Sequence, residues 1–324
     1  MSGPTILFVT EKWAECDPSH GLSNAHHNYI GSFATTGLGT AHTFFFDEHV
    51  VQHGTRCDEA LLERVSQLRP DIVLTTPVRG TDVNPSPLTF ALLRANGGPK
   101  VVMFNGDTCD EHGVRFCEIF APAVDLVVPL DCYTYYPSRV ADPSKYLNAW
   151  TPQDPRLYHA GSDDRTIDVS FIGSVANYTD RRSALNALTA AGIDVTRGGG
   201  QAEGLLSMED YAATLRRSKI VLNFAKPTFE TTVFQCKGRT TETTLSGALL
   251  FEQANPETAH WFTPDVHFVS FANERELVSK VQYYLAQEPK RAAIAEAGRR
   301  HAEQNLSATA FWRRLLNHLS GVSA

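Results

Sequence analysis

The stretch that decides the fold is KGRTTETTLSGALLFE, residues 237–252, in which a helical segment leads directly into a buried strand. We interpret residues 238–247 as the helix, and an apolar block, residues 248–251, follows it. Uninterrupted apolar strands are typical of parallel sheets that helices cover on both faces. The stretch therefore indicates an α/β protein, and it raises the question of why Lys237, Arg239 and Glu242 stand near the head of this helix.

The same alternation of short apolar runs and helical patterns extends along the whole chain. Predicted strands are residues 5–10, 42–47, 71–76, 100–105 and 125–130, then 168–173, 193–198, 219–224, 248–252 and 266–271. Predicted helices are residues 22–36, 57–70, 87–96 and 112–120, then 180–191, 208–218, 238–247 and 273–286, with two more closing the chain. This pattern predicts an α/β fold with doubly wound parallel sheets.

A change in amino-acid composition divides the chain. Residues 137–166 carry four prolines and many polar side chains, which indicates a linker with one short strand near residues 146–150. We therefore expect two Rossmann-like domains, residues 1–150 and 151–324. Because ligands bind at the carboxyl ends of strands in open parallel sheets, two such domains facing each other would form a cleft.

Composition excludes several classes of protein. The chain has 324 residues and a net charge of −7, which argues against general nucleic-acid binding. No apolar run approaches the roughly 20 residues of a membrane-spanning helix. The first residues lack the pattern of a signal peptide, so we expect a cytoplasmic protein. The six cysteines form no CxxC pair, which indicates reduced thiols and neither a zinc site nor a disulfide framework.

The head of the helix in the opening stretch suits a nucleotide. Helix amino termini favour phosphate through their free N–H groups and positive dipole, and Lys237 and Arg239 add charge there. Glu242 lies three residues after Arg239, on the same helix face, and could accept hydrogen bonds from ribose hydroxyls. The alternative is an exposed ion pair of little functional meaning.

Two further strand ends are candidates for ligand contact. Gly173 and Ser174 follow the strand 168–173, where a glycine allows a ligand to approach the backbone closely. No full GxGxxG or GxxxxGK[ST] motif is present, so a plain turn is the alternative. Asn223 ends the strand 219–224 and could face the cleft, or could instead bond to the local backbone.

In the amino-terminal half, two loops after strands carry acid–base groups. The first contains His20, His26 and His27, and the second, NGDTCDEH, contains Asp107 and Asp110. A carboxylate or an imidazole there could act as a general base, although each could equally be a solvated loop residue. The sequence has no HxxxH, HExxH or DxD motif, so we expect no metal cofactor.

The carboxyl-terminal half resembles the CgeB-like (spore-protein type) glycosyltransferases, which have the two-domain GT-B architecture. The matching segments are DVSFIGS, an arginine in the next helix (Arg181 or Arg182), LSMEDYAATLRRSKIVLNF, KGRTTETTLSGALLFE and FANERELVSKVQYYLAQEPKRAAIAEAGRR. The amino-terminal half is similar only in layout, with RPDIVL and FNGD as its recognisable pieces.

The resemblance implies a role for several residues. Glu242 is similar to the second glutamate of the E-x7-E motif of related retaining enzymes, which holds the donor ribose, and Gly247 agrees with that motif. The first glutamate would fall at position 234, where this chain has Phe234. Arg239 is similar to the arginine that clamps the diphosphate. The substitution at position 234 leaves retention of configuration and the donor sugar unassigned.

These observations together predict a metal-independent glycosyltransferase that uses a nucleotide-diphosphate sugar, such as a UDP-sugar. The carboxyl-terminal domain would bind the donor and the amino-terminal domain an acceptor that the sequence does not identify. If the enzyme inverts configuration, Asp107 is the first candidate for the base and His20 the second. The alternatives are a nucleotide-sugar epimerase on the same fold and a non-catalytic nucleotide- or sugar-binding protein.

Overall fold

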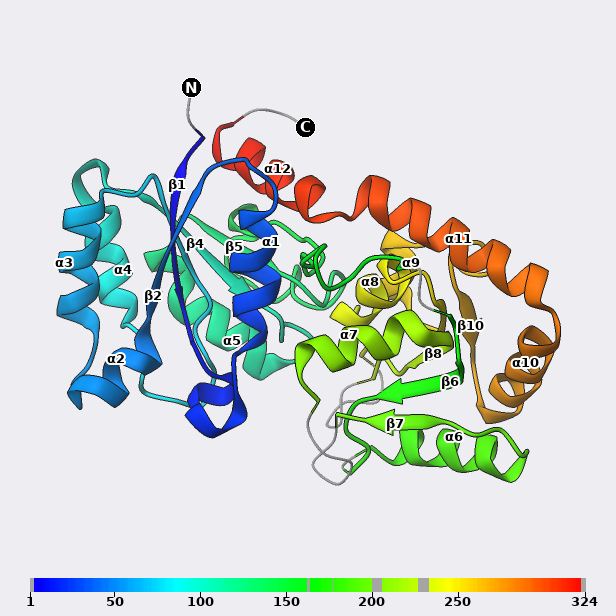
Figure 1. Ribbon diagram of the computed structural model, residues 1–324. Coiled ribbons are helices and arrows are strands. Elements are labelled where there is room, and N and C mark those ends of the chain that lie inside the picture. The colour runs from blue at the N-terminus through cyan, green and yellow to red at the C-terminus, as the bar shows by residue number, and fades with distance from the viewer. Residues whose placement is uncertain (1–2, 162–163, 177, 200–205, 227–232, 322–324) are drawn as a thin grey trace. The chain divides into compact units, whose positions relative to one another are not determined.

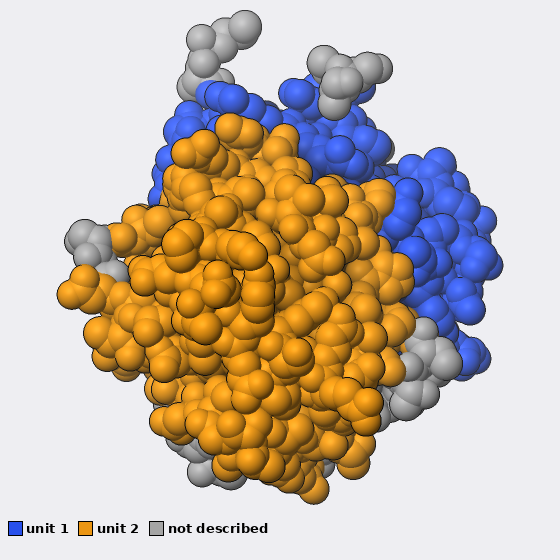
Figure 2. Space-filling model, turned by 90° about the vertical axis from the view of Figure 1, so that its right-hand side faces the viewer, with its two compact units in different colours: residues 1–154, 308–324 blue, residues 155–307 orange. Residues whose placement is uncertain are grey.

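The chain folds into two compact units, shown in a computed structural model (Figure 1, Figure 2). Unit 1 comprises residues 1–154 and 308–324, and unit 2 comprises residues 155–307. The structure describes residues 3–161, 164–176, 178–199, 206–226 and 233–321. Each unit has its own sheet and its own hydrophobic core.

Unit 1 is built on a parallel five-stranded sheet in the order β2-β1-β3-β4-β5. Its strands are β1 (Thr5–Thr10), β2 (Thr40–Phe45), β3 (Ile72–Thr75), β4 (Lys100–Asn105) and β5 (Leu126–Pro129). The chain passes from β1 outward to β2 and then crosses to β3 on the other side of β1. The winding therefore reverses between β1 and β3, which makes the carboxyl ends of these two strands the topological switch point.

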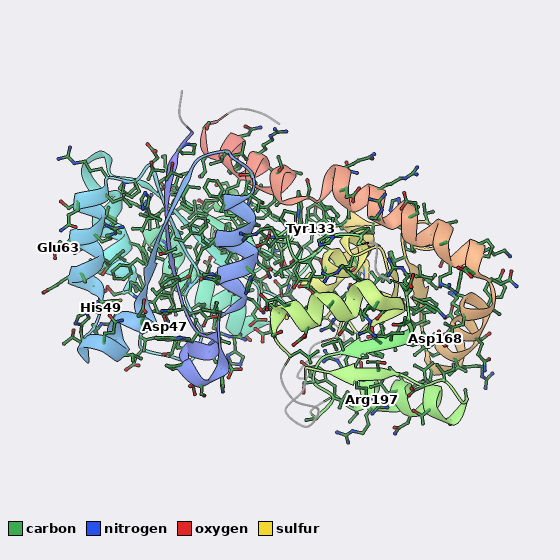
Figure 3. The ribbon with its side chains drawn as sticks, viewed as in Figure 1. Asp47, His49, Glu63, Tyr133, Asp168 and Arg197 are labelled. Atoms are coloured by element: carbon green, nitrogen blue, oxygen red, sulfur yellow. The ribbon has the colours of Figure 1, made fainter. Side chains whose placement is uncertain are left out.

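Helices connect the strands of unit 1, and polar side chains begin several of them. These helices are a π-helix (His26–Gly31) that continues into α1 (Ser32–Ala34), α2 (Phe46–His53), α3 (Asp58–Leu68), α4 (Pro87–Arg94), α5 (Glu111–Phe120) and α12 (Ala308–Leu319). Asp110 caps α5 by accepting a hydrogen bond from the Gly113 N–H at 2.6 Å. Asp47 lies in the first turn of α2 (Figure 3). Short 3₁₀ turns occur at Ala14–Cys16, Pro18–His20, Ala95–Gly97, Ala121–Ala123 and Pro143–Lys145.

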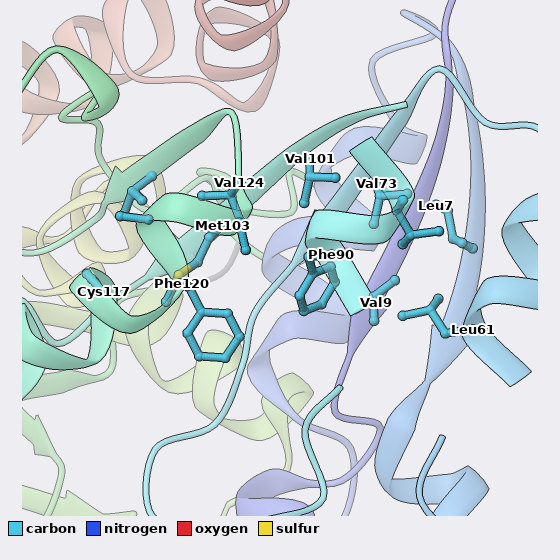
Figure 4. Close-up of a cluster of buried hydrophobic side chains, with 14 of the residues drawn as sticks. Leu7, Val9, Leu61, Val73, Phe90, Val101, Met103, Cys117, Phe120 and Val124 are labelled. Atoms are coloured by element: carbon cyan, nitrogen blue, oxygen red, sulfur yellow. The ribbon is translucent and has the colours of Figure 1, made fainter. Parts of the chain in front are cut away.

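The core of unit 1 lies between the sheet and its helices. Figure 4 shows Phe90 of α4 beside Val9 of β1 and Val73 of β3, and all three side chains are fully buried. Burying a side chain of this size contributes about 1.5–3 kcal/mol. The apolar runs of the strands therefore fix the sheet, as the sequence predicts.

The last helix, α12, belongs to unit 1. Trp312 is fully buried, and its indole N–H donates to the Ser32 hydroxyl at 2.9 Å. Its ring also packs against Phe8 and Phe33, with centroids 5.8 and 5.0 Å away. The predicted division into residues 1–150 and 151–324 therefore differs from the observed one, because residues 308–324 return to the amino-terminal unit.

Unit 2 repeats the same winding. Its strands are β6 (Ile167–Ile172), β7 (Thr196–Gly198), β8 (Ser218–Asn223), β9 (Leu249–Gln253) and β10 (Val269–Phe271), all parallel, in the order β10-β9-β8-β6-β7. The winding reverses between β6 and β8, so the switch point of this sheet lies at the carboxyl ends of those strands.

Apart from α9, the helices of unit 2 lie close to where the sequence predicts them. They are α6 (Thr179–Ala190), α7 (Met208–Arg217), α8 (Gly238–Leu245), α9 (Pro256–Trp261), α10 (Glu274–Ala286) and α11 (Glu288–Asn305). Ser207 caps α7, because its hydroxyl accepts from the Asp210 N–H at 3.0 Å, and Asn273 caps α10 in the same way.

Some local predictions differ from the structure. Tyr146 bridges Val127 of β5, and the Ala149 N–H donates to the Pro129 carbonyl at 3.1 Å, so residues 146–150 run beside β5 without forming a separate strand. The short helices α2 and α9 were not predicted from the sequence. Among the described residues, no helix is long and apolar enough to cross a membrane.

Candidate functional site

At the carboxyl end of β6, the backbone of Gly173 lies close to the side chain of Arg239. Gly173 follows β6 with φ +158°, and a Cβ atom built on it would lie 3.3 Å from Nη2 of Arg239 and 3.5 Å from Nη1. A larger residue here would push against the guanidinium. Gly173 therefore lets Arg239 of α8 lie directly over the turn at the switch point.

Arg239 presents its two Nη atoms without hydrogen-bond partners among the described residues. Its Nε donates to the Tyr211 hydroxyl at 3.3 Å, but neither Nη atom makes a hydrogen bond to any residue that the structure describes. Burial lowers the pKa of this guanidinium, yet the oxygens of Tyr211 and Glu242 outweigh burial and raise the pKa overall. Arg239 is thus a permanent cation with donors available to an anion.

Tyr211, on α7, connects Arg239 to Glu242. Its hydroxyl donates to Oε2 of Glu242 at 2.5 Å while it accepts from Arg239. Burial raises the pKa of Glu242, and the Tyr211 hydrogen bond and the Arg239 charge act against that rise. Arg239 and Glu242 therefore share one side of α8, as predicted, and a tyrosine from another helix fixes them both.

A second guanidinium stands beside the first. Arg181 of α6 is 5% exposed and donates from Nη1 to the Ser174 carbonyl at 2.8 Å. Its Cζ lies 5.9 Å from the Phe171 ring centroid, and the Cζ of Arg239 lies 5.6 Å from the same centroid. Burial lowers the pKa of Arg181 to about 10, and the charge of Arg239 contributes to this decrease.

Two cations held against one aromatic ring repel each other in the absence of an anion. A bound dianion would remove that repulsion and would gain charge-assisted hydrogen bonds from both side chains. The geometry therefore favours a diphosphate or a similar polyanion at this edge of unit 2.

Lys237 and Ser174 flank this group. Lys237 is the residue before α8, its side chain does not cap the helix, and its Nζ donates to Oε1 of Gln235 at 2.6 Å. Ser174 contributes its carbonyl oxygen to Arg181 and leads into the loop before α6. Both predicted residues thus lie at the same strand-end edge as Gly173 and Arg239.

Asn223 does not face this edge. It is fully buried, and its Nδ2 lies 3.4 Å from Oγ1 of Thr240, in the interior beneath α8. Direct contact between Asn223 and the donor therefore stays a prediction, and the buried side chain lies where it can support α8 from beneath.

Beneath α8, Asn223 belongs to a network centred on Glu252, at the end of β9. Oε2 of Glu252 accepts from Thr240 at 2.9 Å, and Oε1 accepts from Thr258 at 2.6 Å and from Asn255 at 3.0 Å. Burial raises the pKa of this carboxyl, and the hydrogen bonds of its neighbours act against the rise. The network ties the first turn of α8 to the sheet, which holds Arg239 in place.

The two acid–base candidates of unit 1 are exposed. Asp107 follows β4 with its side chain 60% exposed, and Arg79 lies 3.4 Å from its carboxylate. Arg79 also lies 3.4 Å from Asp110. His20 ends the 3₁₀ turn Pro18–His20, and its Nδ1 lies 3.4 Å from the carboxylate of Glu15.

Sequence reasoning missed Tyr211 and left open the choice between Arg181 and Arg182. Arg181 is the buried residue of that pair, whereas Arg182 is exposed and donates to carbonyls of residues 175 and 176. No motif marks Tyr211, because its role depends on the packing of α7 against α8. Within the described ranges, no group of three His, Cys, Asp or Glu residues is arranged to hold a metal ion.

Comparison with known proteins bears on the activity class and the fold. A family model described as Glycosyl transferase-like matches residues 165–317, and this match confirms the predicted glycosyltransferase activity class. No curated protein matches the chain significantly.

Solved structures share the fold at low sequence identity. HepE of Anabaena, in complex with UDP and glucose, has a TM-score of 0.68 and 12% identity over 98% of this chain and 100% of its own. A glycosyltransferase from Rickettsia africae has a TM-score of 0.65 and 11% identity over 98% of both chains. A putative UDP-N-acetylglucosamine 2-epimerase from Listeria monocytogenes has a TM-score of 0.60 and 10% identity over 99% of this chain and 98% of its own. The carboxyl-terminal half is thus glycosyl transferase-like in sequence, and the two sheets have the fold of GT-B glycosyltransferases.

Proposed function

We propose that this protein transfers a sugar from a nucleotide-diphosphate sugar to an acceptor, and that unit 2 binds the donor. The observation that carries this proposal is the pair of guanidiniums, Arg181 and Arg239, each within 6 Å of the Phe171 ring at the switch point of unit 2. Parallel sheets bind phosphate-bearing ligands at this place. The match of residues 165–317 to the Glycosyl transferase-like model supplies the reaction class.

Each residue of the site has a proposed part in donor binding. The free Nη atoms of Arg239, together with Arg181, would bind the diphosphate oxygens, and Lys237 would add positive charge. Glu242 would accept hydrogen bonds from the ribose hydroxyls through the oxygen that Tyr211 does not occupy. As the bond to the sugar breaks, the guanidiniums would stabilise the charge that develops on the leaving diphosphate.

The proposal also covers the location of the enzyme, the donor nucleotide, the need for a metal and the acceptor site. The resemblance to CgeB-like enzymes supports a transferase of that type, the sequence pattern at the amino terminus suggests a cytoplasmic one, and the HepE complex with UDP and glucose supports a UDP-sugar as donor. We propose that no metal is required, because cationic side chains take the place of a metal at the diphosphate. The acceptor would bind unit 1, where Asp107 and His20 are the candidates for the base that the sequence suggests.

A second candidate function is a nucleotide-sugar epimerase, because the Listeria structure of that description shares the fold over nearly the whole chain. The two differ in their need for an acceptor. An epimerase converts UDP-N-acetylglucosamine alone, whereas a transferase on its own only hydrolyses its donor slowly. Incubation with the donor alone, followed by NMR of the sugar products, separates them.

Donor binding is tested by a thermal-shift screen with UDP-, GDP-, dTDP- and CDP-sugars. A ligand at about 100 times its dissociation constant should add roughly 2.7 kcal/mol to the free energy of unfolding. Arg217→Ala is the matched control for Arg239→Ala, because Arg217 is an exposed arginine of α7 whose guanidinium bonds to the Thr166 hydroxyl. We expect Arg239→Ala to abolish the shift and Arg217→Ala to keep it. Absence of a shift with all four donors would contradict the proposal.

A further inference from the structure

Helix α2 of unit 1 carries two histidines one turn apart, His49 and His53. The expectation that the chain has no HxxxH spacing is wrong, because residues 49–53 read HVVQH. Side chains four residues apart lie on the same face of a helix. The two ring centroids are 4.5 Å apart, and Figure 3 shows His49 on α2. The two imidazoles therefore lie side by side on one face of this helix.

The ring nitrogens of His49 and His53 are available to a ligand. They make no hydrogen bond or ion pair with any residue that the structure describes. His53 is exposed and His49 is half-buried, so ions in solution can reach both rings. The stacked pair His267 and His301 of unit 2 differs, because each of these rings has a nitrogen bonded to the backbone. The pair on α2 is thus the better candidate for binding an ion.

The surroundings of His49 favour the neutral ring that a metal ion needs. Its imidazole stacks on the Phe44 ring of β2, with the centroids 6.1 Å apart and the planes at 26°. This contact limits the motion of the ring, which reduces the entropy lost on binding. Burial and the neighbouring His53 lower the pKa of His49. A metal ion binds the unprotonated ring, so protons compete less with it near neutral pH.

Two imidazoles select the kind of cation that binds. Imidazole nitrogen suits Zn²⁺, Ni²⁺ and Cu²⁺, whereas Mg²⁺ and Ca²⁺ prefer oxygen ligands. Two nitrogens bound to one tetrahedral Zn²⁺ lie about 3.3 Å apart, since each is roughly 2.0–2.1 Å from the ion. Rings with centroids 4.5 Å apart reach this spacing by rotation of their side chains. Water would fill the remaining positions around the ion.

We propose that His49 and His53 bind one transition-metal ion, such as Zn²⁺, and that this site stabilises unit 1. The ion joins two residues of the last turns of α2 and so holds the helix in its folded form. The same helix carries Asp47, which is 1% exposed and accepts from the Lys12 N–H at 2.8 Å and the Trp13 N–H at 3.0 Å. Metal binding therefore also supports the loop that follows β1.

The ion is no cofactor of the proposed sugar transfer, and the inference does not depend on that function. The diphosphate would bind the guanidiniums of unit 2, whereas α2 belongs to unit 1. EDTA should therefore lower the stability of the zinc-loaded protein and leave the rate of UDP release unchanged. The two proposals can fail separately.

The test titrates zinc chloride into the metal-free full chain by calorimetry. His318→Gln is the matched control for His49→Gln and His53→Gln, because His318 is an exposed histidine of α12 with no histidine one turn away. We expect zinc to bind the unchanged chain and His318→Gln equally. Each of the other two variants should bind zinc roughly 10- to 100-fold more weakly or worse, since even loss of an outer-shell partner costs this much.

A spacing variant tests whether the shared helix face matters. Val51 is 59% exposed, so Val51→His combined with His53→Gln keeps two histidines in α2 but places them two residues apart, on different sides of the helix. We expect this protein to bind zinc as weakly as His53→Gln alone. Urea denaturation without metal checks that all variants fold equally well. Added zinc should raise the midpoint of the unchanged chain and of His318→Gln only, and magnesium should raise none.

Four results would overturn the inference. They are zinc affinity in either single variant of α2 equal to that of the unchanged chain, full affinity in the spacing variant, an equal rise of the urea midpoint in His49→Gln and the unchanged chain, and no zinc binding by the unchanged chain. Loss of binding in His318→Gln would also contradict it, because the zinc site would then lie on α12.

Discussion

The two units have the same strand order but different ionisable side chains at the carboxyl ends of their strands. In unit 2 this edge carries Arg181 and Arg239, and in unit 1 it carries Glu11, Asp107 and Asp131. Asp131 is buried and accepts from the Thr108 hydroxyl at 2.6 Å. The topology determines where a ligand site lies, and the side chains determine its chemistry.

The difference between the two units is clearest at the residue that follows β1 in unit 1 and β6 in unit 2. The first residue after β6 is Gly173, over which Arg239 packs, and the first residue after β1 is Glu11, whose carboxylate stays without a cation in the described structure. Glycine leaves room for the Arg239 guanidinium, and this guanidinium can bind an anion. Glutamate instead places a proton acceptor at the equivalent point of the other sheet. The comparison predicts that an anion binds at the edge of unit 2 and not at the equivalent point of unit 1.

The largest expected effect concerns the stability of unit 1. Trp312→Ala should lower the free energy of unfolding by about 3–5 kcal/mol, because it removes a fully buried indole from the contact with Phe8 and Phe33. Urea denaturation measures this loss. Tyr283→Ala, on the exposed side of α10, is the control and should change little. A Trp312→Ala protein as stable as the unchanged chain would show that α12 is not part of the unit 1 core.

The buried carboxylate of unit 2 should give the next largest effect. Glu252→Ala leaves the donors of Thr240, Thr258 and Asn255 without their acceptor, which should cost on the order of 3 kcal/mol of stability. It should also weaken donor binding, because α8 loses its tie to β9. Calorimetry and urea denaturation of the same preparation check both effects. Unchanged stability would mean that the network does not fix α8.

Tyr211→Phe should have a smaller effect that is confined to binding. The variant keeps the ring but loses the hydroxyl that bonds to both Arg239 and Glu242. We expect about 1 kcal/mol weaker UDP binding, roughly fivefold in dissociation constant, with little change in stability. Tyr283→Phe is the matched control on an exposed tyrosine. Equal UDP affinity in the two variants would remove Tyr211 from the site.

Removal of divalent metal should have no effect. The guanidiniums of Arg181 and Arg239 are expected to neutralise the diphosphate without help. The rate of UDP release from UDP-glucose would be measured with EDTA and then with added magnesium or manganese. A complete loss with EDTA that either metal restores would contradict this expectation.

Much of the fold could be predicted because the strands are continuous apolar runs whose burial depends little on context. The unit against which α12 packs could not be predicted, because the apolar face of this helix shows that it packs but does not show on which unit. Gly173, Arg239 and Glu242 could be placed at one edge because each lies at a strand end or on a helix head. Contact of Asn223 with the donor could not be read from the sequence, because a strand-end residue can point to either side of the sheet. The role of Tyr211 depends on tertiary packing, which leaves no local signal in the sequence.

Titration of UDP by calorimetry tests the central comparison most directly. It would compare the unchanged chain with Arg239→Ala in unit 2 and Glu11→Gln in unit 1. We expect Arg239→Ala to weaken UDP binding by about 1.5–3 kcal/mol, roughly 10- to 150-fold, because the diphosphate loses a charged donor. Glu11→Gln should leave the dissociation constant within about twofold, since its carboxylate belongs to the other edge. Equal affinity of Arg239→Ala and the unchanged chain would contradict the assignment of the donor site to unit 2.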